Sequence, residues 1–305
     1  MRISLTYLYT IFRYGYPPKI ADDFKALAEI HRLGFRYLEM EGLGPQHLSS
    51  VYQNRQQLVK TLQEFGMHVH NFCVVDPDLV NLDISWRKRA LERFKLGAEL
   101  GDYLGVETLH LASYTPPVHY LEGRPYQLEE GDGYCIPNHT RLRVPRNLDW
   151  NQVWGALVSS CQCCADIAAK HGKIVIMEPR VGEIVCSVDS LLRLIEHVGR
   201  ANFKANFDTG HFSAQRENVP LALAKLRGHF ANIHISDNNP INTKHLPIGD
   251  GIIDWREFFR VLKMMGYDGY LGLDLGLNRS LVQGYRKSVE RIQSIASELK
   301  LRVEV

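Results

Sequence analysis

The sequence predicts an α/β protein that folds as a single (β/α)8 barrel. Eight short apolar segments alternate with longer amphipathic segments along the 305 residues. Several of the short segments are rich in Val, Ile, Phe and Tyr, which is typical of parallel strands that are buried on both faces. Eight strand–helix units in this length average about 38 residues each, as in other barrels of this type. We therefore expect residues 1–305 to form one domain.

The expected elements alternate strictly along the chain. The strands are expected at Ile3–Thr6, Tyr37–Glu41, His68–Val74, Glu107–Ala112, Ile174–Glu178, Phe203–Asp208, Phe230–Ser236 and Tyr270–Leu275. The main helices are expected at Ile20–Leu33, Arg55–Phe65, Arg87–Leu104, Val153–Lys170, Ser187–Val198, Pro220–Arg227, Trp255–Met265 and Val282–Leu299. A glycine separates a helical segment from the next strand, as is common at helix ends, at Gly34, Gly66, Gly105, Gly172 and Gly266. Side-chain oxygens of Ser187 and Asp254 are placed to cap helix starts.

One long segment interrupts this alternation between the fourth strand and its helix. Residues 113–150 are rich in Pro, Gly and Tyr and show no periodic apolar pattern. Loops of this length are usually functional or disordered. The aromatic content favours an ordered lid or an interaction surface, so we expect an insertion in the barrel rather than a linker between domains.

The amino-acid composition argues against several classes of protein. Thirty-six basic and thirty-four acidic side chains give a net charge of +2, so we expect no nucleic-acid partner. No apolar run approaches the roughly 20 residues that span a bilayer, and the N-terminus does not resemble a secretory signal. The six cysteines lack the spacing of a disulfide framework or a zinc motif, and they are expected to be reduced. We expect a cytoplasmic protein.

Polar side chains stand at the ends of seven of the eight expected strands. These strand-end residues are Glu41, His70, His110, Glu178, Asp208, His234 and Asp274. In a (β/α)8 barrel the carboxyl ends of the strands carry the active site. Asp237 and His245 follow the seventh strand and belong to the same end of the barrel. Each residue alone has a structural explanation, such as a helix cap or a buried histidine, but the set as a whole indicates a site.

Four of these residues close consecutive strands and should converge. Glu178, Asp208, His234 and Asp274 end strands five to eight. Three carboxylates and one imidazole would repel one another unless a divalent cation neutralised them. Oxygen ligands with one nitrogen suit Mn²⁺, Mg²⁺, Co²⁺ or Zn²⁺, and of these we expect Mn²⁺.

Four segments resemble the xylose-isomerase-like TIM-barrel superfamily, which contains sugar isomerases and epimerases, inosose dehydratases and apurinic endonucleases. They are IVIMEPR (174–180), NFDTGH (206–211), NIHISDN (232–238) and PIGDGIIDW (247–255). The resemblance implies that Glu178, Asp208, His234 and Asp274 are metal ligands. It also implies that Arg180 and His211 contact the substrate, and that His70 and His110 line the mouth of the barrel.

The sequence also departs from the branches of this superfamily. The epimerases usually carry Glu where this chain has Asp274, and an arginine shortly after His234 where this chain offers Asn238, Asn239 and Lys244. The endonucleases resemble the chain at most of their ligand positions, but Thr243 replaces a required aspartate. An asymmetric acid/base pair is therefore expected in place of two equivalent glutamates.

The resulting prediction is a metal-dependent sugar isomerase or epimerase that abstracts a proton next to a carbonyl through a metal-stabilised enediolate. Glu178, His110 or His139 is expected to be the base, with Asp274 as a further catalytic group. Substrate contacts are assigned to His70, Arg180, His211, Asp237 and His245.

Two lyases remain alternatives to the isomerase or epimerase. One is an inosose-type dehydratase, and the other is the catalytic subunit of a C-glycoside deglycosidase, which cleaves 3-keto-C-glycosides by elimination. The aromatic insertion would suit a glycoside substrate or a smaller partner subunit. An apurinic endonuclease and a non-catalytic scaffold subunit are less favoured. We expect a homo-oligomer, or a hetero-oligomer with that smaller subunit, and no membrane partner.

Overall fold

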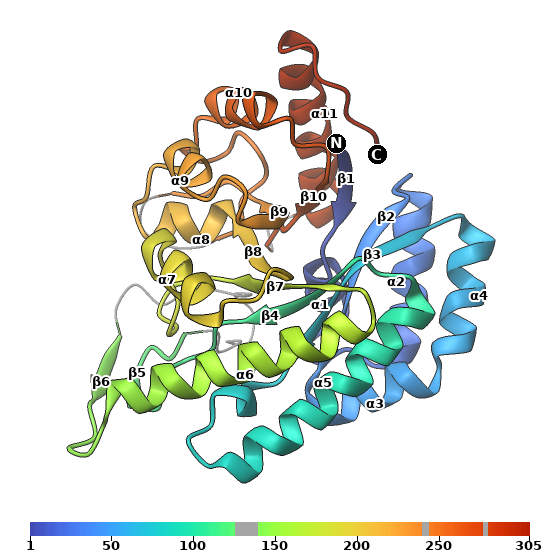
Figure 1. Ribbon diagram of the computed structural model, residues 1–305. Helices are drawn as coiled ribbons and strands as arrows, with labels where there is room; N and C mark the ends of the chain where they lie inside the picture. Colours follow the sequence, from blue (N-terminus) through green and yellow to red (C-terminus); the bar gives the residue numbers. More distant parts are fainter. Residues whose placement is uncertain (126–139, 240–243, 277–279) are drawn as a thin grey trace.

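The computed structural model describes residues 1–125, 140–239, 244–276 and 280–305. Within these residues eight parallel strands form a closed barrel (Figure 1). The strands are β1 (Arg2–Leu5), β2 (Tyr37–Leu43), β3 (His68–Val75), β4 (Thr108–Ala112), β7 (Ile174–Glu178), β8 (Phe203–Asp208), β9 (Phe230–Ile235) and β10 (Tyr270–Leu273). The order around the barrel is that of the sequence, and β10 closes the barrel against β1. The predicted fold class and all eight predicted strands are confirmed.

The helices surround the barrel. They are α1 (Leu8–Tyr14), α2 (Ile20–Arg32), α3 (Gly44–Gln53), α4 (Arg55–Phe65), η1 (Pro77–Val80), α5 (Ile84–Leu104), α6 (Trp150–Lys170), α7 (Val188–Val198), α8 (Thr209–Ala214), α9 (Val219–Lys225), α10 (Trp255–Met265) and α11 (Leu281–Glu298). The eight main helices agree with the prediction, whereas the short α1, α3, η1 and α8 were not predicted. These four elements directly follow strands, so they shape the mouth rather than the wall. None of the described helices is both long and apolar enough to cross a bilayer.

The ends of the helices carry the glycines and capping residues that the sequence predicts. All five glycines expected between a helix and a strand have a positive φ, as in Gly66 (62°) and Gly105 (71°). Ser187 caps α7 by accepting a hydrogen bond from the backbone N–H of Ser190, and Asp254 caps α10 in the same way. Local sequence therefore fixes where these helices begin and end.

The insertion between β4 and α6 contains a second small sheet. Strands β5 (His119–Glu122) and β6 (Arg141–Arg143) pair antiparallel beside the barrel (Figure 1). The chain enters this insertion through Ser113, whose Oγ lies within hydrogen-bond distance of the carboxylate of Glu183 (2.6 Å) and of the backbone oxygen of Val185 (2.9 Å). Tyr114 accepts a hydrogen bond from the backbone N–H of Ile184 at 2.9 Å. These contacts attach the start of the insertion to the loop after β7.

Side chains of β2 illustrate how the barrel interior is layered. Successive side chains of a strand point to opposite faces, so Glu39 and Glu41 both face the interior. Glu39 is buried and lies deep in the barrel, whereas Glu41 lies one layer nearer the mouth. We call the buried set Glu39, His70, Asn71 and Asn232 the deep layer, and the set Glu178, Asp208, His234 and Asp274 the mouth layer.

Candidate active site

A pocket opens at the carboxyl ends of the strands. Its polar wall is formed by Glu41, His110, Glu178, Arg180, His211, His234, His245 and Asp274. Its apolar wall is formed by Leu8, Ile11, Tyr16, Leu43, Cys73, Val75 and Ala112. The pocket thus has one side that can bind polar groups or a cation and one side that excludes water.

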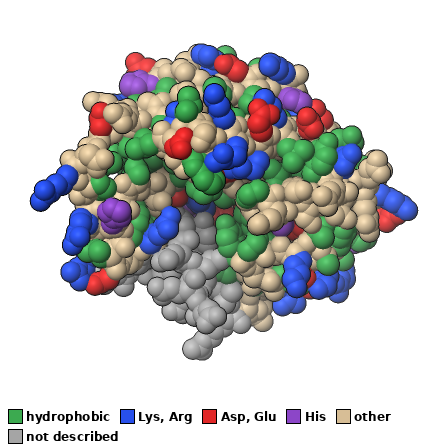
Figure 2. Space-filling model, turned by 90° about the horizontal axis from the view of Figure 1, so that it is seen from below, with side chains coloured by type: hydrophobic (Ala, Val, Ile, Leu, Met, Phe, Trp, Pro, Cys, Tyr) green, Lys and Arg blue, Asp and Glu red, His purple; other side chains and the backbone are tan. Residues whose placement is uncertain are grey.

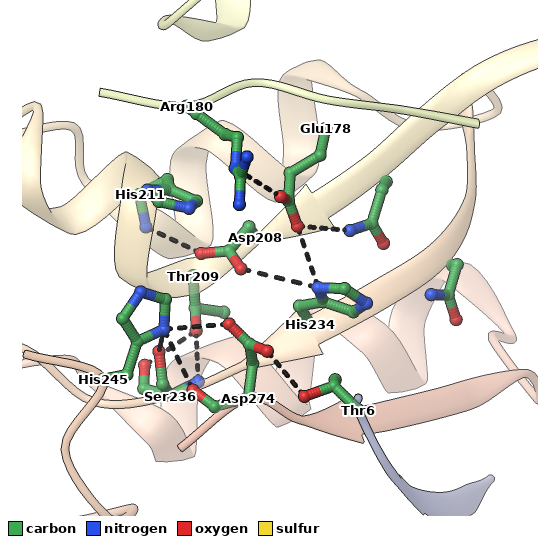
Figure 3. A network of polar contacts seen from close by, with 12 residues as sticks. Thr6, Glu178, Arg180, Asp208, Thr209, His211, His234, Ser236, His245 and Asp274 are labelled. Carbon is green, nitrogen blue, oxygen red and sulfur yellow. Dashed lines mark hydrogen bonds and ion pairs between the residues drawn. The ribbon is translucent and has the colours of Figure 1, made fainter. Parts of the chain in front are cut away.

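Glu178, Asp208 and His234 bring donor atoms together at the polar wall. One donor atom from each residue lies within 4.8 Å of the others. Nδ1 of His234 is 2.9 Å from Oε1 of Glu178 and 3.8 Å from Oδ2 of Asp208 (Figure 3). The three residues end or nearly end the adjacent strands β7, β8 and β9, which explains why they converge.

The two oxygens of Asp208 have different environments. Oδ1 accepts a hydrogen bond from the backbone N–H of His211 at 2.7 Å and so caps α8. Oδ2 is buried and accepts no hydrogen bond from any described residue. A buried carboxylate oxygen without a donor is costly, so this atom is available for a ligand.

The orientation of His234 is set from below by Glu39. Nε2 of His234 is 3.0 Å from Oε2 of Glu39, which leaves Nδ1 directed at Glu178 and Asp208. Glu39 also accepts hydrogen bonds from the side-chain amides of Asn71 (2.7 Å) and Asn232 (3.0 Å). A histidine that binds a metal commonly donates its other N–H to a carboxylate. Because Glu39 already has these donors, it fits the supporting carboxylate better than a ligand.

The charged groups of the mouth layer shift one another's pKa values. Burial raises the pKa of Asp208 to about 7, and the negative charges of Glu178 and Asp274 contribute to this rise. Burial also acts to raise the pKa of Glu178, but the hydrogen bond with His234 and the charges of His110 and Arg180 hold it well below its usual value. Burial acts to lower the pKa of His234, but Glu39 and Glu178 raise it well above its usual value. The imidazole of His234 is thus shared by Glu39 and Glu178, whereas the ionised form of Asp208 is disfavoured.

These features fit a divalent cation. The site offers an unpartnered carboxylate oxygen, a second carboxylate and an imidazole nitrogen whose ring is fixed by another carboxylate. A cation among them would favour the ionised form of Asp208, whose pKa is raised by its neighbours. Oxygen and nitrogen ligands of this kind suit several divalent metals and do not distinguish between them.

Asp274 lies at the edge of this cluster. One carboxylate oxygen accepts a hydrogen bond from the hydroxyl of Thr6 at 2.6 Å, and the other is 2.9 Å from Nδ1 of His245. Asp274 is not among the residues whose donor atoms converge most closely. Its predicted role as a fourth ligand stays a proposal.

His110, Arg180, His211 and His245 surround the cluster as predicted for residues of the mouth. Nε of Arg180 is 3.0 Å from Oε2 of Glu178, and Nε2 of His110 is 3.9 Å from Oε1 of the same carboxylate. Burial lowers the pKa of His110 to about 4 and that of His211 to about 3. Both rings are therefore neutral at pH 7, which suits hydrogen bonding to sugar hydroxyl groups but makes His110 a weak base.

Two predicted substrate contacts lie elsewhere. His70 is the third residue of β3 and belongs to the deep layer, where Nε2 is 2.9 Å from Oγ of Ser4 and the ring stacks on Tyr270. The pocket end of β3 is formed by Cys73 and Val75 instead. The structure thus places His70 below the pocket, because β3 continues five residues past it, and its predicted contact with substrate stays a prediction.

Asp237 is likewise buried outside the pocket. It accepts hydrogen bonds from the indole N–H of Trp255 (2.8 Å) and the backbone N–H groups of Gly249 (2.8 Å) and Ile253 (3.2 Å). A Cβ on Gly251 would lie 2.2 Å from Oδ1 of Asp237, so the loop can pass only as glycine. Asp237 holds this loop, and its predicted contact with substrate stays a prediction. The predicted base His139 lies outside the described residues.

Sequence reasoning missed the supporting residues of the site. Glu39, Asn71 and Asn206 stand inside strands rather than at their ends, and Asn206 donates a hydrogen bond to Oε1 of Glu178 at 2.9 Å. Charged or amide side chains within buried strands were the available signal, because such groups are seldom buried without a partner. Glu41 was noted as a strand end but was not assigned to the site, whereas the structure places it in the pocket wall.

The fold and the converging donors define a (β/α)8-barrel protein with a mouth suited to a divalent cation. The sequence pattern of the xylose isomerase-like TIM barrel family matches residues 27–295, and the chain belongs to this family. It is 25% identical over 244 residues to the L-ribulose-5-phosphate 3-epimerase UlaE of Escherichia coli K12, covering 78% of this chain and 76% of that protein.

Solved structures share the fold along nearly the whole chain. A D-tagatose 3-epimerase-like protein superposes with a TM-score of 0.74 at 19% identity, covering 98% of this chain and 100% of the other. The IolI protein, whose structure is described with a bound zinc atom, has a TM-score of 0.71 at 16% identity, covering 98% and 99% of the two chains.

Proposed function

We propose that this protein is a divalent-metal-dependent sugar epimerase that abstracts a proton next to a carbonyl group. The carrying observation is the convergence of Glu178, Asp208 and Nδ1 of His234 around an unpartnered buried oxygen, inside a pocket that also contains Arg180 and His211. The names of the relatives support the substrate class, since an L-ribulose-5-phosphate 3-epimerase and a D-tagatose 3-epimerase-like protein are among them.

Glu178, Asp208, His234 and Asp274 would hold the cation. When bound, the cation supplies Lewis acidity that polarises a carbonyl and stabilises the negative charge that develops on its oxygen. Glu178 is the proposed base, because one of its oxygens faces the pocket beside Arg180 and the other accepts from Asn206. Arg180, His211 and His245 orient the sugar by hydrogen bonds to its oxygens, and Asp274 is secured by Thr6 and His245.

The apolar wall limits how water reaches the reacting carbon. Leu8 and Ile11 come from α1, while Tyr16 follows that helix, and together they face the polar wall across the pocket. Excluding water strengthens the interactions of Arg180 and His211 with the sugar, because the local dielectric constant is lower.

The test follows substrate protons in D2O. Protein stripped with a chelator and protein reloaded with Mn²⁺, Co²⁺, Mg²⁺ or Zn²⁺ are incubated with L-ribulose, L-ribulose 5-phosphate and D-tagatose, and NMR records epimer formation and deuterium incorporation. We expect both signals only with a cation, and their loss in Glu178→Gln. The matched control is Glu107→Gln, a partly exposed carboxylate that pairs with His68 at the other end of the barrel.

Two other outcomes of this experiment would identify a different reaction. Elimination would release a leaving group and give an unsaturated product, as expected of a lyase. Turnover without deuterium exchange would contradict proton abstraction. Acidic and basic side chains of the described residues are interspersed on the face of the molecule shown in Figure 2, which does not favour an endonuclease.

A further inference from the structure

Epimerisation requires two proton-transfer groups in the pocket, and the mouth layer does not provide both of them. One group removes a proton from a carbon, and a second group must deliver a proton to the opposite face of that carbon. Glu178 lies on β7, and the other mouth-layer carboxylates lie on β8 and after β10. Asp274 is already engaged by Thr6 and His245. The second group must therefore come from another side of the barrel.

Glu41 occupies the opposite side. The strand order places β2 directly opposite β8, which ends in Asp208, and three strands away from β7, which ends in Glu178. Glu41 and Glu178 line the same pocket, and Cys73 and His110 follow Glu41 around its rim through the registers of β2, β3 and β4. A sugar held by the mouth layer would have Glu178 on one face and Glu41 on the other.

Glu41 also differs from the other carboxylates of the interior in its contacts. Glu39, two residues earlier, accepts hydrogen bonds from Asn71 and Asn232 and pairs with His234. Glu41 forms no hydrogen bond or ion pair with any residue of the described chain. Its carboxyl group is thus not used to hold the fold together.

The surroundings of Glu41 favour its protonated form. The apolar wall (Leu43, Cys73 and Val75 among its members) lies on its side of the pocket. Burial raises the pKa of Glu41 to about 8, against the opposing charge of Arg180 and with a further contribution from Glu178. A carboxylic acid of this kind is a proton donor at neutral pH.

We propose that Glu41 is the second proton-transfer residue of the epimerase, an assignment that rests on the proposed function. The carbon–hydrogen bond breaks as a carboxylate oxygen of Glu178 takes the proton, and the electron pair moves into the adjacent carbonyl. A new carbon–hydrogen bond then forms on the opposite face with the proton of Glu41, whose oxygen keeps the electron pair. In the reverse direction the two residues exchange roles, and solvent restores their protons.

Other groups of the pocket do not meet the geometric requirement. His110 lies 3.9 Å from Glu178, so its ring is on the same side as the base. His211 follows Asp208 on α8, and its backbone N–H binds that residue. Arg180 contacts Glu178 directly. Among the described side chains that line the pocket, Glu41 combines the opposite side with an uncommitted carboxyl group.

The experiment separates proton removal from inversion. Wild-type protein, Glu41→Gln, Glu41→Asp and the control Glu107→Gln are loaded with Mn²⁺ and incubated with the three sugars in D2O. For Glu41→Gln we expect epimer formation to fall by about 10²- to 10⁴-fold. Exchange of the substrate proton for deuterium with retained configuration should continue, because Glu178 is intact. Glu41→Asp should restore part of the inversion.

Binding and folding are measured on the same samples. Titration calorimetry with Mn²⁺ and thermal unfolding should give wild-type values for Glu41→Gln, since no hydrogen bond is removed. Epimerisation by Glu41→Gln at the wild-type rate would overturn the inference and leave the proposed function intact. Parallel loss of exchange, inversion and Mn²⁺ binding would also overturn it, because Glu41 would then be structural. Absence of exchange and inversion in the wild type would refute the proposed function, and the inference with it.

Discussion

The deep layer and the mouth layer of the barrel are both buried, but their carboxylates Glu39 and Asp208 differ in how their oxygens are satisfied. Glu39 and Asp208 expose 4% and 0% of their surface. In the deep layer Glu39 is surrounded by donors, and the carbonyl oxygen of the Asn71 side chain accepts a hydrogen bond from Thr108 at 2.7 Å. In the mouth layer Oδ2 of Asp208 lacks a donor among the described residues. The number of hydrogen-bond partners, not burial, distinguishes the supporting carboxylate Glu39 from Asp208.

His234 connects the two layers. Its ring is held by Glu39 below and presents Nδ1 to Glu178 and Asp208 above. Glu39 of the deep layer thus fixes the position of a group in the mouth layer. Substitutions in the deep layer should therefore change stability and cation affinity, whereas those in the mouth layer should chiefly change cation binding and turnover.

The largest effect is expected for Asp208. Asp208→Asn keeps a side-chain oxygen that can cap α8 but removes the charge, so Mn²⁺ affinity should fall by more than about 100-fold, beyond the range for supporting residues. Asp208→Ala also removes the cap and should lose about 1 kcal/mol of stability in addition. Calorimetry and urea unfolding measure the two quantities. Unchanged Mn²⁺ affinity in Asp208→Asn would show that the unpartnered oxygen does not mark a ligand.

His70 of the deep layer should make a separable contribution to the pH dependence of stability in the acid range. Burial lowers the pKa of His70 to about 4, against about 6.5 in the unfolded chain, so the unfolded state binds more protons between these values. The contribution of His70 to stability is therefore fully present above pH 6.5 and is lost as the pH falls towards 4, by about 3 kcal/mol. In His70→Gln this contribution should disappear from urea unfolding curves measured at pH 7, 5.5 and 4. An unchanged acid slope would mean that His70 is not neutral in the folded protein.

Glu39→Gln tests the connection between the layers. The amide still accepts from Asn71 or Asn232, but it no longer supplies a negative charge to His234. We expect Mn²⁺ affinity to fall by about 10- to 100-fold, as for other carboxylates that support a metal-binding histidine. The comparison variant is Glu107→Gln at the opposite end of the barrel. Equal Mn²⁺ affinities of Glu39→Gln and Glu107→Gln would show that the deep layer does not affect the metal site.

The smallest effect is expected for Trp255→Phe, which removes one of several donors to Asp237. Because the remaining donors still satisfy the carboxylate, the free energy of unfolding should fall by only about 1 to 2 kcal/mol. Mn²⁺ affinity and the Michaelis constant should not change. A changed Michaelis constant would place Asp237 among the substrate-binding residues.

The sequence predicted the structure best where a single physical rule determines which residues a segment contains. Apolar runs with glycine or capping residues at their borders predicted every strand of the barrel, because burial on both faces leaves little freedom of composition. The end of a strand also predicted the convergence of Glu178, Asp208 and His234. The depth of His70 could not be predicted from its residue type, since depth depends on how far β3 continues beyond it.

The remaining residues depend on long-range contacts. Glu39 meets His234 across 195 positions of sequence, and Ser4 meets His70 across 66. A pattern of strands does not specify which polar side chains share a layer, because that follows from the stagger of the strands around the barrel. For the same reason the sequence could not predict that Glu41 forms no hydrogen bond or ion pair with the described residues, because this depends on which side chains surround it.

The attachment of the insertion has a consequence for how this barrel can diversify. Ser113 and Tyr114 are tied to the loop after β7, and Asp149 caps α6 where the barrel resumes. The described part of the chain between these points contributes no residue to the mouth layer. Doubling the length of a loop costs only about 0.6 kcal/mol in chain entropy. Evolution or an engineer can therefore lengthen or replace this segment at little cost in stability, while the residues of the mouth layer are kept.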